Sequence, residues 1–289
     1  MGSNLGCSLP TPSTPAGRDG LAALLARPRR AVIALDFDGT LADIVPDPEQ
    51  ARAHPGTVAA LAALAPKVAS IAVITGRPAG VAVRYGGFAG VAGLDHLVVL
   101  GHYGAERWDA VTGQVRAPDI PPGIAAVRAE LPGFLDRSGA RPGTWVEDKG
   151  RALAVHTRRT EDPDTALEQL RGPLLALAER HGLVAEPGRM VLELRPPGAD
   201  KGAALRDFAH ECKARAVLYA GDDLGDLAAF GAVDKLRTEG VPGLLVCSAT
   251  ADGEAPVREL ADRADLVVDG PAGVVALLDS LATEVSRGG

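Results

Sequence analysis

Two carboxylates, Asp36 and Asp38, stand two positions apart, directly after the apolar run Ala31–Leu35 and directly before Gly39 and Thr40. An unbroken run of Ala, Val, Ile and Leu is typical of a strand that is buried on both faces of a parallel sheet. Ligands of open α/β sheets bind beyond the carboxyl ends of the strands, so these acids are candidates for chemistry. Asp and Gly are also ordinary turn residues, so the stretch alone leaves a simple turn open.

Three further polar clusters follow predicted strands or open a predicted helix: Thr75 with Gly76, Lys201, and Asp222 with Asp223 and Asp226. Carboxylates gathered at one sheet edge repel one another, so a hard cation with oxygen ligands is expected, and Mg²⁺ is the usual one beside a phosphate. One carboxylate can then attack phosphorus while a Lys neutralises the growing charge. A second carboxylate can serve as general acid and then base. These residue types predict phosphoryl transfer through an aspartyl phosphate.

The elements around these clusters alternate between strands and helices. Ala31–Leu35, the helix Pro55–Lys67 and the strand Ser70–Ile74 form a βαβ unit, which implies parallel strands and a right-handed crossover. Later strands and helices continue the pattern at His96–Leu100, Asp200–His210, Ala216–Ala220, Gly243–Cys247, Pro256–Ala261, Asp265–Val268 and from Pro271 onward. The predicted fold class is α/β, a doubly wound and mostly parallel sheet.

The order of helices and hairpins in the middle of the chain predicts an inserted α+β module. It would begin with a hairpin at Glu106–Val115 and continue with two helices and two further hairpins, at Ile124–Arg137, Thr144–Thr157, Asp164–His181 and Leu183–Leu194. We therefore predict a catalytic core at 21–104 and 197–289 and an α+β cap at 105–196. Residues 1–20 are rich in Ser, Pro, Thr and Gly without an apolar run, which predicts a disordered tail and no signal peptide.

The composition of the chain indicates which classes of partner and which cellular compartment to expect. Apolar residues make up 46% of the chain, enough for a core, and the net charge of -7 comes without a basic stripe, so nucleic acid is not expected as a partner. No run of about 18 apolar residues occurs, so no membrane contact is expected. Three cysteines without CxxC spacing imply neither a disulfide framework nor a zinc site. A reducing cytoplasm fits best.

The four polar clusters, taken in order, resemble the motifs of the haloacid dehalogenase superfamily of phosphotransferases: DFDGT from Asp36, ITGR from Ile74, Lys201, and GDDLGD from Gly221. The resemblance implies that Asp36 is the nucleophile and Asp38 the acid that protonates the leaving oxygen and then activates water. Thr75 and Lys201 would bind the phosphoryl group, and we also expect Thr75 to cap the helix that follows. Mg²⁺ would be held by Asp36, the backbone carbonyl of Asp38, and Asp222, supported by Asp223 and Asp226.

Three longer runs are similar to trehalose-6-phosphate phosphatases: GHYGAE (101–106), VEDKGRALAVHTRR (146–159) and VLELRPPGADKG (191–202). The resemblance implies a sugar phosphate as the small-molecule partner, and a functional link to the enzyme that makes trehalose 6-phosphate. The substrate-binding residues would be Glu147, Lys149 and Glu193, with His156 and Arg158 as weaker candidates, and Gly76 and Arg77 of the second motif. Glu147 and Lys149 as a solvated hairpin tip, and Arg77 as an ordinary surface Arg, are the alternatives.

The expected reaction is Mg²⁺-dependent hydrolysis of trehalose 6-phosphate to trehalose and phosphate. Two alternatives stay open. One is the same chemistry on another capped substrate, such as sucrose phosphate or a phosphorylated glycosyl glycerate. The other is a sugar-phosphate binding protein without turnover, which the pair Asp36 and Asp38 disfavours, because binding alone needs no acid/base residue.

Overall fold

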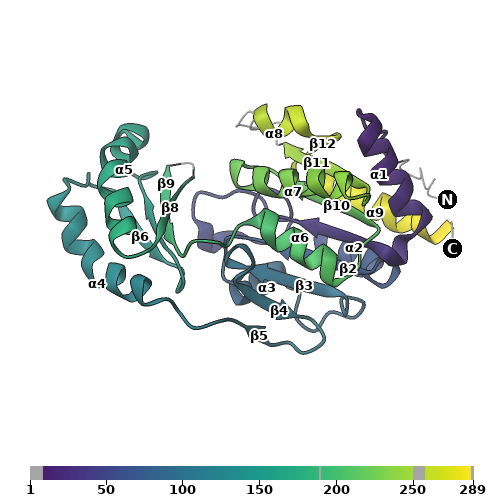
Figure 1. The fold of residues 1–289 in the computed structure, drawn as a ribbon, viewed down its shortest axis with the longest axis horizontal. Coiled ribbons are helices and arrows are strands. Elements are labelled where there is room, and N and C mark those ends of the chain that lie inside the picture. The colour runs from purple at the N-terminus through teal and green to yellow at the C-terminus, as the bar shows by residue number, and fades with distance from the viewer. Residues whose placement is uncertain (1–8, 189, 250–257, 288–289) are drawn as a thin grey trace. The chain divides into compact units, whose positions relative to one another are not determined.

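The run Ala31–Leu35 forms strand β1, every residue of which is buried. Seven further strands share its sheet: β2 (Ser70–Ile74), β3 (Leu97–Gly101), β4 (Glu106–Asp109), β5 (Val115–Arg116), β10 (Ala216–Gly221), β11 (Gly243–Ala249) and β12 (Leu266–Asp269). Their order is β12-β11-β10-β1-β2-β3-β4-β5, parallel from β12 to β3 and antiparallel at β4 and β5 (Figure 1). β1 therefore lies inside the sheet and opens at its carboxyl end onto Asp36.

Alternate residues of β1 point to opposite faces of this sheet, and each face has its own hydrophobic core. Ile33 and Leu35 pack in one core with helices α1 (Pro15–Ala26), α2 (Thr57–Leu64), α3 (Ala79–Gly86) and α9 (Gly270–Arg287). Val32 and Ala34 pack in the other with α6 (Lys201–Glu211), α7 (Leu227–Thr238) and α8 (Arg258–Arg263). Helices on both faces explain why the strand carries no polar alternation. The predicted doubly wound α/β core is confirmed.

The structure, a computed structural model, describes residues 9–188, 190–249 and 258–287. The chain divides into two units, one made of the residues up to Ala117 and from Asp200 onward, the other of Pro118–Ala199. The first unit thus extends beyond the predicted boundary at 104, because β4 pairs with β3 through Gly101↔Glu106 and Val98↔Asp109. The hairpin that we assigned to the insert is an edge of the core sheet.

The second unit contains an antiparallel sheet in the order β6-β7-β9-β8. Its elements are α4 (Pro122–Arg137), β6 (Trp145–Asp148), β7 (Leu153–His156), α5 (Pro163–Arg180), β8 (Val184–Gly188) and β9 (Val191–Arg195). Leu153, Val155, Leu192 and Leu194 pack against both helices. The residues that alternate with them along the strands, Ala154, His156 and Glu193 among them, therefore point to the other face of this sheet.

Residues 9–20 do not form the predicted disordered tail. Helix α1 begins after Thr14, whose hydroxyl accepts a hydrogen bond from the Gly17 amide at 2.9 Å. The Ser13 amide donates to the backbone carbonyl of Asp265 at 2.8 Å, and a Cβ on Gly17 would lie 2.4 Å from the Asp265 Cβ. The prediction was wrong because it weighed composition alone, whereas distant contacts hold this helix. The prediction for residues 1–8 lies outside the described residues.

No helix among the described residues is long and apolar enough to cross a membrane.

Candidate active site

Asp36 is buried, with 4% of its surface exposed, at the carboxyl end of β1, where its amide donates to the Ala220 carbonyl of β10 at 2.9 Å. Lys201, the first residue of α6, is also 4% exposed, and its Nζ lies 2.9 Å from Asp36 Oδ1 and 2.8 Å from Asp226 Oδ1. A buried charge is tolerated when it is paired and hydrogen-bonded. The structure therefore brings together the lysine and the aspartate that the sequence predicted for phosphoryl transfer.

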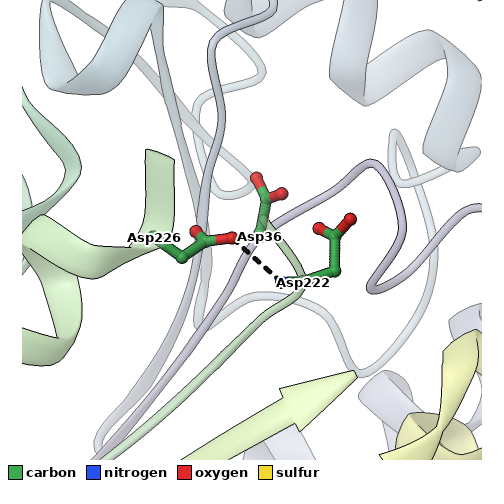
Figure 2. A group of neighbouring side chains, drawn as sticks. All are labelled: Asp36, Asp222 and Asp226. Atoms are coloured by element: carbon green, nitrogen blue, oxygen red, sulfur yellow. Dashed lines mark hydrogen bonds between the residues drawn. The ribbon is translucent and has the colours of Figure 1, made fainter. Parts of the chain in front are cut away.

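Asp226 is fully buried and organises this site. Its Oδ1 accepts hydrogen bonds from Lys201 Nζ and from the Tyr219 hydroxyl at 2.6 Å. Its Oδ2 accepts from the Asp223 amide at 3.1 Å and from the Asp222 amide at 2.9 Å, the bond that is dashed in Figure 2. Burial acts to raise the pKa of Asp226, but the charge of Lys201 and these hydrogen bonds lower it below the usual value. Because both oxygens are engaged, Asp226 is suited to holding its neighbours in place.

Three carboxylates, those of Asp36, Asp222 and Asp226, each offer an oxygen within 4.8 Å of the others. Figure 2 shows these three side chains. Asp222 Oδ1 is buried and has no hydrogen-bond partner among the described residues. Burial raises the pKa of Asp36 and Asp222 well above the usual range, and repulsion between neighbouring carboxylates adds to the increase. An unpartnered buried carboxylate oxygen beside a second carboxylate fits a hard cation. The group can hold a metal.

Asp223 is not a member of that group. Its Oδ1 accepts from the Gly225 amide at 2.9 Å, and its side chain forms a reciprocal capping box with Asp226 at the start of a short 3-10 turn. Gly39 leaves room for the Asp222 side chain. Gly39 has φ +74°, and a Cβ there would lie 2.0 Å from Asp222 Oδ2, so only glycine fits between β1 and this carboxylate. Metal binding by Asp223 stays a prediction.

Asp38 is paired with Arg77. Arg77 Nε donates to Asp38 Oδ2 at 2.7 Å, Nη2 donates to Oδ1 at 2.6 Å, and Nη1 donates to the Pro48 carbonyl at 3.0 Å. The side chain of Arg77 is 12% exposed. The alternative that Arg77 is an ordinary surface arginine is therefore wrong, since its guanidinium is committed to the predicted acid/base residue.

Thr75 and Gly76 form the turn after β2. Thr75 is 1% exposed, and its Oγ1 accepts from the Arg77 amide at 3.1 Å. Helix α3 has Pro78 at its N-cap and no side-chain cap, so the expectation that Thr75 caps this helix is wrong: the hydroxyl closes the preceding turn. A Cβ on Gly76 would lie 2.7 Å from the Tyr103 hydroxyl oxygen, which explains the glycine by packing.

In the second unit, Glu147, His156 and Glu193 share the sheet face that α4 and α5 leave open, since Glu147 pairs with Ala154 and Ala154 pairs with Glu193. His156 Nε2 lies 2.9 Å from Glu147 Oε2. Lys149 Nζ donates to Glu193 Oε2 at 2.5 Å, and Glu193 is 5% exposed. Its second oxygen, Oε1, is buried with no partner among the described residues. This face therefore presents a buried acceptor.

Arg158 is exposed in the turn after β7, while its neighbour Arg159 lies with its guanidinium carbon 4.3 Å from the centre of the Trp145 ring. Trp145 stacks on His156, with ring centroids 4.4 Å apart and planes within 9°. Sequence analysis missed Trp145 and also Tyr219. For Tyr219 a signal existed, because a Tyr inside the buried strand AVLYA needs a partner for its hydroxyl.

Sequence comparisons with known proteins show which family the chain belongs to. The family model described as Trehalose-phosphatase matches residues 34–262. The trehalose-phosphate phosphatase of Mycolicibacterium paratuberculosis is 32% identical over 279 residues, which covers 94% of this chain and 66% of the relative. This chain spans 64–66% of the length of the first curated relatives that it matches.

Solved structures share the fold. The C-terminal domain of the C. albicans trehalose-6-phosphate phosphatase superposes with a TM-score of 0.72 at 21% identity, covering 96% of this chain and 99% of that one. A haloacid dehalogenase-like hydrolase from Bacteroides thetaiotaomicron gives 0.52 at 14% identity, covering 89% and 98%. At these identities the likeness shows the fold alone, and it confirms the predicted doubly wound α/β fold with an inserted α+β module.

Proposed function

Because the chain belongs to the trehalose-phosphatase family, we propose that it releases trehalose and phosphate from trehalose 6-phosphate. The observation that carries the chemistry is the contact between Asp36 and Lys201 at the carboxyl end of β1. A carboxylate held beside a buried ammonium can attack phosphorus while the cation stabilises the charge that develops on the phosphoryl oxygens. The similarity to trehalose-phosphate phosphatases supports the substrate, and the site supports the reaction class.

In the proposed reaction, an Asp36 oxygen forms a bond to phosphorus as the bond from phosphorus to the sugar oxygen breaks. The electron pair stays on the sugar oxygen, which takes a proton from the Asp38 carboxyl group. Water then attacks phosphorus and gives a proton to Asp38, while the bond from phosphorus to the Asp36 oxygen breaks, which releases phosphate and restores the Asp36 carboxylate. An acid is needed in the first step because a sugar alkoxide is a poor leaving group. Thr75 lies on the neighbouring strand end, where its hydroxyl would donate to the phosphoryl group.

The cation in this proposal is Mg²⁺, held by the side chains of Asp36 and Asp222 and by the backbone carbonyl of Asp38. The buried, unpartnered Oδ1 of Asp222 supports the assignment. When bound, Mg²⁺ would supply positive charge to the phosphoryl oxygens. Asp226 would hold Lys201 and the Asp222 loop in place, since its oxygens already accept four hydrogen bonds.

The sugar would be bound by Glu147, Lys149 and Glu193, with His156 orienting Glu147 through their 2.9 Å contact. The hydroxyl groups of a disaccharide both donate and accept hydrogen bonds. A carboxylate acceptor beside a lysine donor is therefore suited to bind them. The buried Glu193 Oε1, which has no donor among the described residues, supports an acceptor role. Arg158 is the weakest candidate because it is exposed.

The test is a phosphate-release assay on trehalose 6-phosphate, sucrose phosphate, a phosphorylated glycosyl glycerate and glucose 6-phosphate, with Mg²⁺ and the full chain. We expect the highest kcat/KM for trehalose 6-phosphate and loss of turnover in Asp36→Asn. Equal rates for trehalose 6-phosphate and glucose 6-phosphate would contradict the substrate. Equal, negligible rates for the native chain and Asp36→Asn would favour a binding protein.

We also propose a functional link to the enzyme that makes trehalose 6-phosphate, as the class of reaction that must supply this substrate. A cytoplasmic location belongs to the same proposal and rests on the cysteine pattern.

A further inference from the structure

The turn between β6 and β7 carries Lys149 between Asp148 and Gly150. Asp148 Oδ1 accepts from the Gly150 amide at 2.8 Å, and the Lys149 amide donates to the Ala152 carbonyl at 3.0 Å. Gly150 has φ +82°, a conformation that favours glycine. These bonds close the turn, but none of them ties it to the rest of the second unit.

Arg128, on α4, makes that connection. Its Nε donates to Asp148 Oδ2 at 2.5 Å, and its Nη2 donates to Asp148 Oδ1 at 3.0 Å and to the Gly150 carbonyl at 2.8 Å. One guanidinium thus holds the residues on both sides of Lys149. The planar fork of Arg matches a carboxylate with two bonds, which a Lys ammonium cannot reproduce. The hydrogen bond from Arg128 also lowers the pKa of Asp148, so this carboxylate stays ionised at neutral pH.

A second anchor lies one residue further along the chain. Arg151 is buried, at 7% exposure, and donates from Nη1 to the Pro118 carbonyl at 2.6 Å and from Nη2 to the Asp119 carbonyl at 2.9 Å. The turn that carries Lys149 is therefore fixed on both sides by arginines. Lys149 reaches Glu193 Oε2 from this turn, which leaves Glu193 Oε1 as the unpartnered acceptor.

We propose that Arg128 is a positioning residue for the sugar: by fixing the turn from Asp148 to Gly150, it holds Lys149 against Glu193 in the orientation that the disaccharide meets. The inference rests on the proposed function for its substrate. A lysine has four rotatable side-chain bonds, and ordering them costs free energy each time a ligand binds. A turn that is already fixed reduces this cost, so Arg128 would act on substrate binding without touching the substrate.

The simpler reading is that Arg128 and Asp148 form a stabilising ion pair and nothing more. Their side chains are 39% and 44% exposed, and exposed pairs contribute little to stability. The two readings differ in the property that a substitution changes. Substitution in a purely stabilising pair lowers only the free energy of unfolding, whereas substitution of a positioning residue raises KM for the sugar phosphate.

The first experiment compares Arg128→Ala with Arg180→Ala in the full chain. Arg180 forms a similar exposed pair with Glu130, at 2.5 Å, and so serves as the matched control. For Arg128→Ala we expect KM for trehalose 6-phosphate to rise by about fivefold, which corresponds to about 1 kcal/mol, with kcat changed by less than about twofold. KM for p-nitrophenyl phosphate, which has no sugar, should not change. Arg180→Ala should change neither value.

A double-mutant cycle with Lys149→Ala tests whether Arg128 acts through the lysine. In the Lys149→Ala background, Arg128→Ala should raise KM no further, and Arg128→Lys in the native background should restore only part of the loss. Additive effects, or an equal rise in KM for both substrates, would overturn the proposal.

Hydrogen exchange at the amides of Lys149 and Gly150, which are both hydrogen-bonded within the turn, gives a readout that does not depend on turnover. Arg128→Ala should speed exchange in this turn, and Arg180→Ala should not. If the native chain does not hydrolyse trehalose 6-phosphate, the proposed function fails while this measurement still decides whether Arg128 orders the turn. Unchanged exchange in Arg128→Ala would overturn the inference whatever the substrate.

Discussion

Arg77 and Asp38 are joined by two hydrogen bonds, from Nε to Oδ2 at 2.7 Å and from Nη2 to Oδ1 at 2.6 Å. This fork-to-fork geometry fixes the plane of the carboxylate. A third bond, from Nη1 to the Pro48 carbonyl, fixes the guanidinium in turn. The arginine of the second motif thus orients the predicted acid/base residue of the first.

Arg77→Ala should therefore impair the proton transfer more than phosphate binding. We expect turnover of trehalose 6-phosphate, which needs a proton on its leaving oxygen, to fall at least about tenfold more than turnover of p-nitrophenyl phosphate, whose leaving group needs none. Arg77→Lys keeps the positive charge but not the planar fork, so its turnover of trehalose 6-phosphate should lie between that of the native chain and that of Arg77→Ala. Equal losses on both substrates, with raised KM, would instead assign Arg77 to phosphate binding.

Asp36→Asn should abolish turnover without destabilising the fold. Loss of a nucleophile is expected to lower kcat by about a thousandfold or more. The amide is nearly isosteric and neutral, and burial already raises the pKa of Asp36, so removal of its charge should not lower Tm. Calorimetry and phosphate release measure the two properties, with the exposed Asp207→Asn on α6 as control. A large fall in Tm would contradict this account.

The stabilising effect of Mg²⁺ should grow with pH. A carboxyl group whose pKa is raised in the fold contributes stability below its unfolded pKa of about 3.9, and loses it as the pH rises through the higher folded pKa. Burial raises the pKa of both Asp36 and Asp222 in this way. Without a cation, ionisation of this pair therefore lowers the free energy of unfolding as the pH rises, and a bound cation offsets the loss.

Calorimetry with and without Mg²⁺ checks this expectation. The rise in Tm on adding Mg²⁺ should be larger at about pH 8 than at about pH 5, because protons compete with the cation for the same oxygens. Asp222→Asn should remove most of the rise. A Tm increase that is independent of pH, or that survives Asp222→Asn, would place the cation elsewhere.

Thr14→Ala should destabilise the first unit although the residue lies in the segment that composition marked as disordered. Its Oγ1 accepts from the Gly17 amide and is hydrogen-bonded to Asp265, which is 1% exposed and also accepts from the Leu245 amide at 2.7 Å. Loss of an N-cap costs about 1 kcal/mol. Urea denaturation should show this loss, and Thr283→Ala, at an exposed position of α9, should not.

The core of the site could be predicted because its residues follow strands directly. Asp36, Thr75 and Asp222 stand at the carboxyl ends of parallel neighbours, so strand order alone brings them together. The roles of Arg77 and Arg128 could not be predicted in this way, since each depends on a side chain that reaches another element across the fold. Local composition predicts neither contact.

Two errors in the fold have the same origin. Residues 9–20 include Pro, Ser, Thr and Gly, so their composition favours disorder, yet contacts with Asp265, about 250 residues away, hold the start of α1. The β4–β5 hairpin resembles the hairpins of the insert in its local sequence, yet its strand β4 pairs with β3 of the core sheet. In each case a long-range contact decided between two readings that local propensity could not separate.

The stacking of Trp145 on His156 has a practical use. The chain contains two tryptophans, and the other, Trp108, is 4% exposed in the core of the first unit. Each unit therefore carries its own fluorophore, one packed in a hydrophobic interior and one on the open face of the small sheet. With Trp108 replaced by Phe, the fluorescence emission spectrum would come from Trp145 alone. It would therefore report on Glu147, His156 and whatever binds beside them, without an added label.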